Sequence, residues 1–196
     1  MLILIAGLIV FLGTHALRVI APDWRERMMA RLGLTVWRTL VSAGSLAGFG
    51  LICWGFAQAR LTAVLLWTPP LWTRHAAALL VLIAFVLLAS FFVPRNAIKT
   101  KVRYPVTLAV AVWAGAHLLA NGKMADAVLF GAFLLWAIWD LAVLRRQDHR
   151  IGPPVHPPGA VSGALLAAGI GIIGWALFLF WLHIRLIGIA PLGWTL

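Results

Sequence analysis

The stretch AAALLVLIAFVLLASFFV, residues 76–93, decides the fold, because it contains no charged side chain. A helix needs about 20 mostly apolar residues to cross the hydrocarbon core of a bilayer, which is roughly 30 Å thick. His75 precedes the stretch and Pro94 follows it, so residues 75–94 form a complete candidate span. The stretch therefore predicts an integral membrane protein built from helices.

The composition of the whole chain agrees with this prediction. Of its 196 residues 63% are hydrophobic and 11% charged, whereas soluble domains have roughly 45–50% and about 25%. A net charge of +11 would suggest nucleic-acid binding in a soluble protein. Here the basic residues lie in short connections between apolar runs, so we expect contact with anionic lipid and no nucleic-acid binding. The single cysteine, Cys53, excludes an intramolecular disulfide, and we expect it to be a small buried apolar residue.

Six stretches satisfy the length criterion for a span. They are residues 2–20, 36–57, 75–94, 105–121, 124–144 and 160–185. No basic residue precedes Arg18, so the first stretch reads as a retained helix rather than a cleaved signal. We predict an all-α, polytopic bundle of about six transmembrane helices. Residues 1–150 would form a five-helix membrane domain, and residues 151–196 a Pro/Gly-rich loop with the sixth helix.

The basic residues predict the orientation of the bundle. Four of the sixteen flank the second and fourth connections and the C-terminal end: Arg60, Arg74, Lys123 and Arg185. The other twelve flank the first, third and fifth connections: Arg18, Arg25, Arg27, Arg31, Arg38, Arg95, Lys99, Lys101, Arg103, Arg145, Arg146 and Arg150. By the positive-inside rule these three connections are cytoplasmic and both termini face outward.

Two kinds of local pattern refine the prediction. Residues 21–38, APDWRERMMARLGLTVWR, read as a short amphipathic surface segment with Asp23 as N-cap and Gly33 at its end. The small-residue faces GSLAGFG (44–50) and GIGIIG (169–174) favour close helix packing, within one chain or in a homo-oligomer.

Ionisable residues inside a span are costly, so each is a candidate functional residue. His117 lies deepest in its apolar helix, with Trp113 one turn before it and Asn121 one turn after. His15 is similarly embedded, one turn before Arg18. For both, a ligand or catalytic role is favoured over packing.

The remaining polar residues of the spans have simpler explanations. His75 begins the third span, where interfacial placement explains it as well as chemistry does, and His183, near the outer end of the last helix, is expected to pack. His149 and His156 belong to a polar cytoplasmic loop. Asp140 is expected to pair with Arg145 or Arg18, and Asp126 to interact favourably with the dipole of its helix start.

Imidazoles on different membrane helices are the usual protein ligands of non-covalent haem. Zinc requires a third or fourth ligand, for which the carboxylates are poorly placed. His15 and His117 lie about 6 Å to opposite sides of their helix midpoints, so one haem between them requires tilt. His75 and His117 match better in depth, and both pairs remain open. The chain contains no nucleotide-binding glycine motif, CxxCH haem attachment, HExxH pair or nucleophile elbow.

The sequence also resembles the NnrU family of bacterial inner-membrane proteins. The resemblance covers about the first three-quarters of the chain and little of the last helix. The matching stretches are GLIVFLGTHALR (7–18), RLGLTVWRTLVSAGSLAGFGLICWGFAQAR (31–60), LWTPPLWTRHAAALL (66–80), RYPVTLAVAVWAGAHLLANG (103–122) and DAVLFGAFLLWAIWD (126–140).

That family is similar to the 15-cis-zeta-carotene isomerases, membrane enzymes with haem b. The resemblance implies haem ligation by His15 and His117. We keep His75, which matches His117 in depth, as a substitute ligand or outer partner. It also implies a role in denitrification beside nitrite or nitric oxide reductases. Where the family has Arg-His-Pro, this chain has Tyr104 before Pro105. A phenol does not replace a neutral imidazole easily, which weighs against isomerase chemistry more than against haem binding.

Three functions therefore remain open at the level of sequence. The first is a haem-b-binding protein of nitric oxide or nitrite metabolism, with Tyr104, Trp113 and Asn121 near the haem ligands. The second is a haem-dependent cis-trans isomerase of a polyene or lipid, which needs an apolar cavity beside the haem. The third is a non-enzymatic assembly or maturation factor for a respiratory reductase.

Overall fold

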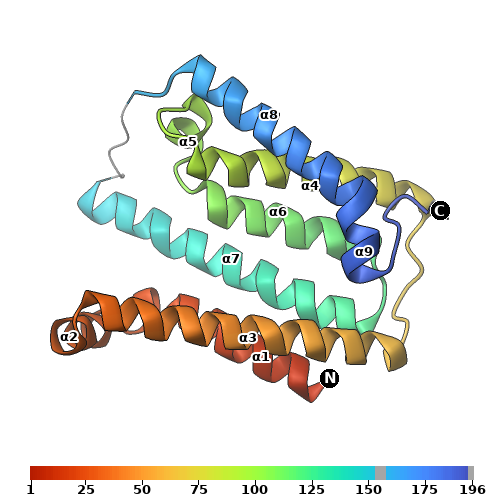
Figure 1. Ribbon diagram of the computed structural model, residues 1–196, viewed down its shortest axis with the longest axis horizontal. Helices are drawn as coiled ribbons and strands as arrows, with labels where there is room; N and C mark the ends of the chain where they lie inside the picture. The colour runs from red at the N-terminus through yellow and green to blue at the C-terminus, as the bar shows by residue number, and fades with distance from the viewer. Residues whose placement is uncertain (153–157, 194–196) are drawn as a thin grey trace.

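The computed structural model describes residues 1–152 and 158–193, which form one bundle of helices (Figure 1). His156 lies outside these residues. Five helices are long and apolar enough to cross a membrane, and a shorter apolar helix joins them, which confirms the predicted all-α membrane bundle. The helices are α1 (Leu2–Ile20), α2 (Pro22–Leu32), α3 (Leu34–Thr62), α4 (Leu71–Phe92), α5 (Ala97–Val102), α6 (Pro105–Ala120), α7 (Met124–Ile151), α8 (Val161–Leu177), a π-helical turn (Phe178–Leu182) and α9 (His183–Ile187).

Several helices extend beyond the apolar stretches that predicted them. α3 runs over Leu34–Thr62 rather than 36–57, and α7 continues to Ile151 rather than 144. α4 begins at Leu71, so His75 lies inside a helix and not at its start. Hydropathy marks the membrane part of a helix, whereas polar helix formers such as Arg and Gln continue the hydrogen-bonded ladder beyond it.

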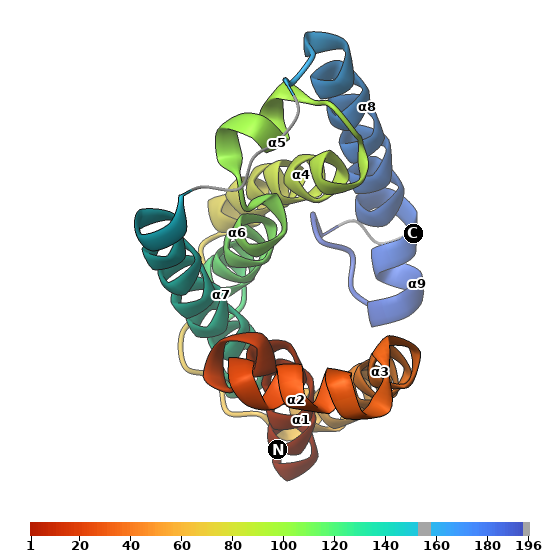
Figure 2. The same ribbon diagram turned by 90° about the vertical axis from the view of Figure 1, so that its left-hand side faces the viewer.

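The segment between α1 and α3 forms the short helix α2, which lies across the ends of both (Figure 2). The expected N-cap Asp23 is wrong: Ala21 is the N-cap and Pro22 opens the helix, where its missing N–H costs nothing. Gly33 ends α2 with a φ of 79°, as predicted. The Trp24 ring packs 5.8 Å from the Trp37 ring and holds α2 against α3.

Small residues let neighbouring helices approach closely within the chain. A Cβ added to Gly48 of α3 would lie 2.7 Å from the Phe11 backbone nitrogen of α1, and one added to Gly171 of α8 would lie 2.6 Å from the Val86 Cα of α4. Both small-residue faces thus pack inside one chain. Cys53 is exposed and not buried, because it lies on a face of α3 that no neighbouring helix covers. In a bilayer such a face contacts lipid, which tolerates a small apolar side chain.

The helices pack in the order α3, α1, α7, α6, α4 and α8. Two side-chain hydrogen bonds join the last span to the other helices. The Trp175 indole N–H donates to the Ala78 carbonyl of α4 at 2.9 Å, and Arg60 of α3 donates to the Ile187 carbonyl of α9 at 2.8 Å. The sixth span therefore belongs to the same bundle as the first five.

Candidate functional site

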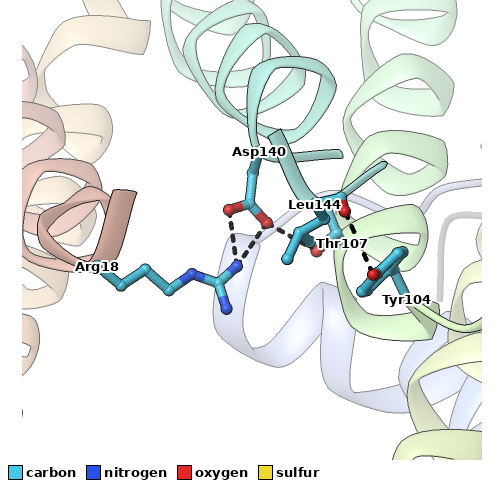
Figure 3. A network of polar contacts seen from close by, with 5 residues as sticks. All are labelled: Arg18, Tyr104, Thr107, Asp140 and Leu144. Atoms are coloured by element: carbon cyan, nitrogen blue, oxygen red, sulfur yellow. Dashed lines mark hydrogen bonds and ion pairs between the residues drawn. The ribbon is translucent and has the colours of Figure 1, made fainter. Parts of the chain in front are cut away.

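A buried carboxylate forms hydrogen bonds to α1 and α6 from α7 (Figure 3). We call the end of the bundle at which Arg18 and Arg103 lie the basic end. Asp140 of α7 is 1% exposed, and both of its carboxylate oxygens lie 2.7 Å from Arg18 Nη2 of α1. The Thr107 hydroxyl of α6 donates to Asp140 Oδ2 at 3.0 Å. The predicted pairing of Asp140 is confirmed, and the partner is Arg18 rather than Arg145.

A second ion pair lies beyond the first. Arg103 Nη1 is 3.3 Å from Asp148 Oδ2, and the Tyr104 hydroxyl donates to Asp148 Oδ1 and to the Leu144 carbonyl. Burial, followed by the hydrogen bond to Asp148, raises the pKa of Tyr104 to about 12, so the phenol stays neutral at physiological pH. Tyr104 precedes His117 by thirteen residues, about 20 Å along a helix. The two side chains therefore cannot bind one metal ion.

The contacts along α7 establish how α1 and α6 run. Going toward the basic end, α7 residues 133, 136 and 140 contact α1 residues 11, 15 and 18 in turn. α7 residues 130, 133 and 140 contact α6 residues 117, 113 and 107 in turn. α1 therefore runs parallel to α7, whereas α6 runs antiparallel to it and hence antiparallel to α1.

His15 and His117 have the same local geometry. His15 Nδ1 lies 2.8 Å from the Phe11 carbonyl oxygen, and His117 Nδ1 lies 2.8 Å from the Trp113 carbonyl oxygen, each four residues before it. A ring that donates from Nδ1 to a carbonyl is held in the tautomer whose Nε2 can bind a metal ion. Neither Nε2 has a hydrogen-bond partner among the described residues.

The two imidazoles lean in opposite directions along the bundle axis. A helical side chain that bonds to the carbonyl four residues earlier points toward the N-terminus of its own helix. Because α1 and α6 are antiparallel, the His15 ring leans away from the basic end and the His117 ring leans toward it. Their α7 neighbours Trp136 and Phe130 are six residues apart, about 9 Å along the helix. These contacts are made by the imidazole rings themselves, so the two rings lie at levels about 1.7 turns of α7 apart.

A continuous row of ring contacts joins the two histidines. We call Phe11, Phe133 and Trp113 the aromatic row. The successive centroid distances from His15 through the row to His117 are 4.5, 5.8, 5.5 and 5.2 Å. His117 also stacks on Phe130, with centroids 4.4 Å apart and planes inclined by 26°. Each imidazole therefore packs against one aromatic ring of its own helix and one of α7: Phe11 and Trp136 for His15, Trp113 and Phe130 for His117.

The other candidates lie apart from this row. Asn121 is the C-cap of α6, and its side-chain amide donates to the His117 carbonyl at 2.8 Å, so it ends the helix that carries His117. His75 is exposed and makes no hydrogen bond or ring contact with any residue that the structure describes. His149 lies in the last turn of α7 and not in a loop as expected, because α7 continues to Ile151, and its side chain is exposed. Asp126 accepts from the Lys123 backbone N–H at 3.2 Å, as expected at a helix start.

Two features of the site were missed by the sequence analysis. His183, which was expected only to pack, lies within range of an electrostatic interaction with His117 and is held through Nδ1 by the Ile189 carbonyl at 2.7 Å. It follows directly on the π-helical turn, an irregularity that no hydropathy pattern reveals. The indole N–H of Trp136, beside His15, is buried and has no acceptor among the described residues.

The number of possible metal-ligating side chains limits which metal or cofactor the site could bind. Among residues 1–152 and 158–193, no three His, Cys, Asp or Glu side chains form a group that could hold a metal ion. A zinc site needs three or four protein ligands. His15 and His117 supply two imidazoles from different helices.

Comparison with known proteins gives one match. No curated protein and no solved structure matches the chain. The family model described as NnrU protein matches residues 3–191. The expectation that the resemblance covers little of the last helix is therefore wrong. The chain belongs to the NnrU family.

Proposed function

We propose that this chain is a haem-b-binding protein of the bacterial inner membrane that acts in nitric oxide or nitrite metabolism. His15 and His117 would be the axial ligands. One observation carries the proposal: both rings are oriented by an Nδ1 contact of 2.8 Å to a backbone carbonyl, and both Nε2 atoms lack partners among the described residues. This is the arrangement that a ligating histidine requires.

The surroundings of the two rings also fit a haem. A porphyrin is a large planar apolar group, and the rings that contact the two histidines are apolar: Phe11 packs on His15, and Trp113 and Phe130 pack on His117. The buried indole N–H of Trp136 is an unpaired donor next to His15, as expected where a polar atom of a bound group completes the hydrogen bonding.

The residues of the chain would hold the haem and exclude water, and would not react themselves. When bound, haem iron supplies a centre that changes oxidation state and takes up nitric oxide where one imidazole is displaced. His117, half-buried and stacked on Phe130, is the better fixed ring, whereas His15 is exposed on α1. His15 would therefore be the ligand that exchanges, and the aromatic row would exclude water from the site.

The alternatives receive less support. An isomerase needs an apolar cavity beside the haem, whereas Trp113 packs on Phe130 and Phe133 and Trp136 packs beside His15. The assembly-factor role, with a reductase or a second copy of the chain as partner, rests on no particular contact. The proposed role in nitric oxide or nitrite metabolism is supported by what the resemblance to the NnrU family implies.

The test is haem retention by histidine variants of the full chain, expressed with added haem and purified in detergent. We expect His117→Ala to lose the Soret band. His15→Ala should keep haem but change from a six-coordinate to a five-coordinate spectrum, and its reduced form should bind nitric oxide faster than the parent protein. The matched control is His149→Ala, because His149 is an exposed imidazole of α7 far from the row.

Two outcomes would contradict the assignment. If His117→Ala retains the parent spectrum, His117 is not a ligand and the proposal fails. If the six-coordinate spectrum survives His15→Ala and is lost in His183→Ala, the second ligand lies on the last helix instead of α1.

A further inference from the structure

Arg18 is held by a buried carboxylate and still has unused donors. A guanidinium has five N–H donors. Only Nη2 of Arg18 contacts Asp140, and Nη1 and Nε make no hydrogen bond to the residues that the structure describes. The side chain is 49% exposed although its partner is 1% exposed. Arg18 can therefore bind a second anion without giving up Asp140.

The position of Arg18 relates it to the candidate haem ligands. It follows His15 by three residues, which places both on one face of α1 about 4.5 Å apart along the axis. Both contact α7, His15 at Trp136 and Arg18 at Asp140, one helical turn further on. Arg18 thus lies directly beyond His15 on the side of the basic end.

Asp140 fixes the guanidinium in this position without saturating it. Its carboxylate accepts from Arg18 and also from the Thr107 hydroxyl at 3.0 Å, so its charge is shared between two donors on two helices. A guanidinium can pair with two carboxylates through different edges, because its donors point outward in a planar fork.

Haem b carries two propionate carboxylates at one edge of an otherwise apolar ring. A carboxylate buried in an apolar bundle without a partner is strongly unfavourable. We propose that Arg18 binds a haem propionate through its Nη1 and Nε edge and that Asp140 acts as the positioning residue. This inference rests on the proposed function. It makes Arg18 a cofactor-binding residue and turns the carboxylate edge of the haem toward the basic end.

The test compares haem with haem dimethyl ester, in which both carboxylates are neutral. Full-length protein purified without haem in detergent is titrated with each compound, and binding is followed by the Soret band. Arg18→Gln alone would leave Asp140 unpaired and risk misfolding. The variant is therefore Arg18→Gln combined with Asp140→Asn, which keeps a neutral hydrogen-bonding pair.

The matched control is Arg103→Gln combined with Asp148→Asn. Arg103 is also 49% exposed and also pairs with an aspartate of α7. We expect the Arg18 variant to bind haem about tenfold more weakly and the ester as well as the parent does, because one charge-assisted hydrogen bond is lost. The control variant should bind both compounds unchanged. The reduced spectrum of the Arg18 variant should stay six-coordinate, because the axial ligands are intact.

Three results would overturn the inference, and they differ from failure of the proposed function. Equal loss of both compounds in the Arg18 variant means that Arg18 acts through packing. No loss of either means that Arg18 does not contact the cofactor. Equal affinity of the parent protein for haem and for the ester means that no carboxylate is recognised. If the parent protein binds neither compound, the proposed function itself fails.

Discussion

The polar groups at the basic end and the two imidazoles nearer the centre of the bundle differ in how completely they are hydrogen-bonded. Asp140 and Asp148 each accept from two side chains, and these bonds join α1, α6 and α7. His15 and His117 use only Nδ1 and contact only their own helices in this way. The first arrangement stabilises a fold, because buried polar groups must be paired. The second leaves a metal-binding atom available on each ring. The comparison predicts that network variants alter stability and that imidazole variants alter ligand binding.

The largest stability effect is expected from removing the partner of the most buried charge. Arg18→Ala leaves Asp140 with only Thr107, and breaking such a pair costs about 3 kcal/mol. Arg103→Ala should cost less than about 1 kcal/mol, because Asp148 is 10% exposed and keeps the Tyr104 hydroxyl. Thermal unfolding of both variants in one detergent measures the difference. Equal losses would mean that the two ion pairs do not differ as described.

A smaller loss is expected when Asp140 keeps its ion pair but loses its second donor. Thr107→Val preserves the shape of the side chain and removes the hydroxyl that donates to Asp140 Oδ2. A hydrogen bond to a charged group contributes about 1.5 kcal/mol. The loss in free energy of unfolding for Thr107→Val should therefore lie between the losses for Arg103→Ala and Arg18→Ala. If the variant is as stable as the parent protein, the Thr107 hydroxyl of α6 does not stabilise the fold through Asp140.

The imidazole side of the comparison should show almost no stability change. His15 is exposed and bonds only within its own helix turn. His15→Ala should change the free energy of unfolding of the haem-free protein by about 0.5 kcal/mol or less. The same unfolding measurement tests this value. A loss comparable to that of Arg18→Ala would give His15 a structural role and weaken the case for ligation.

The subtlest effect is on the titration of Tyr104, the only tyrosine of the chain. Its pKa of about 12 lies above the usual value of about 10, so the folded protein retains a proton that the unfolded chain loses in between. The resulting stability is complete below pH about 10 and is lost as the pH rises through about 12. Tyrosinate absorbance should show the high midpoint, and Asp148→Ala should lower it toward 10. An ordinary midpoint in the parent protein would mean that the Tyr104 hydroxyl does not donate to Asp148.

The hydropathy of the sequence and the free-energy cost of placing a charge in a membrane predicted much of this structure. The length of each apolar run predicted six spans, and the cost of a carboxylate in a membrane predicted a cation beside Asp140. The small faces around Gly48 and Gly171 predicted close packing. These features depend on the composition of single helices or on the high cost of an unpaired charge in a membrane, so they can be predicted without knowing how the helices are arranged.

The rest depends on how helices are rotated about their axes, which hydropathy does not determine. The aromatic row requires that particular faces of α1, α6 and α7 meet. The direction of the His183 side chain depends on the π-helical turn that directly precedes it. The bond from Tyr104 to Asp148 depends on the extension of α7 beyond its apolar part. His15 and His117 were found from sequence by their depth, but their opposite tilts became apparent only from the antiparallel course of α1 and α6.

The most direct test is the absorption spectrum of the full-length protein, expressed with added haem, purified in detergent and recorded oxidised and dithionite-reduced. A pyridine haemochrome assay of the same sample gives the amount and type of haem. The account predicts near-stoichiometric haem b with sharp reduced α and β bands, as two axial imidazoles produce. A spectrum without a Soret band after haem supplementation would contradict it. His15 and His117 would then be packing residues with unused ring nitrogens.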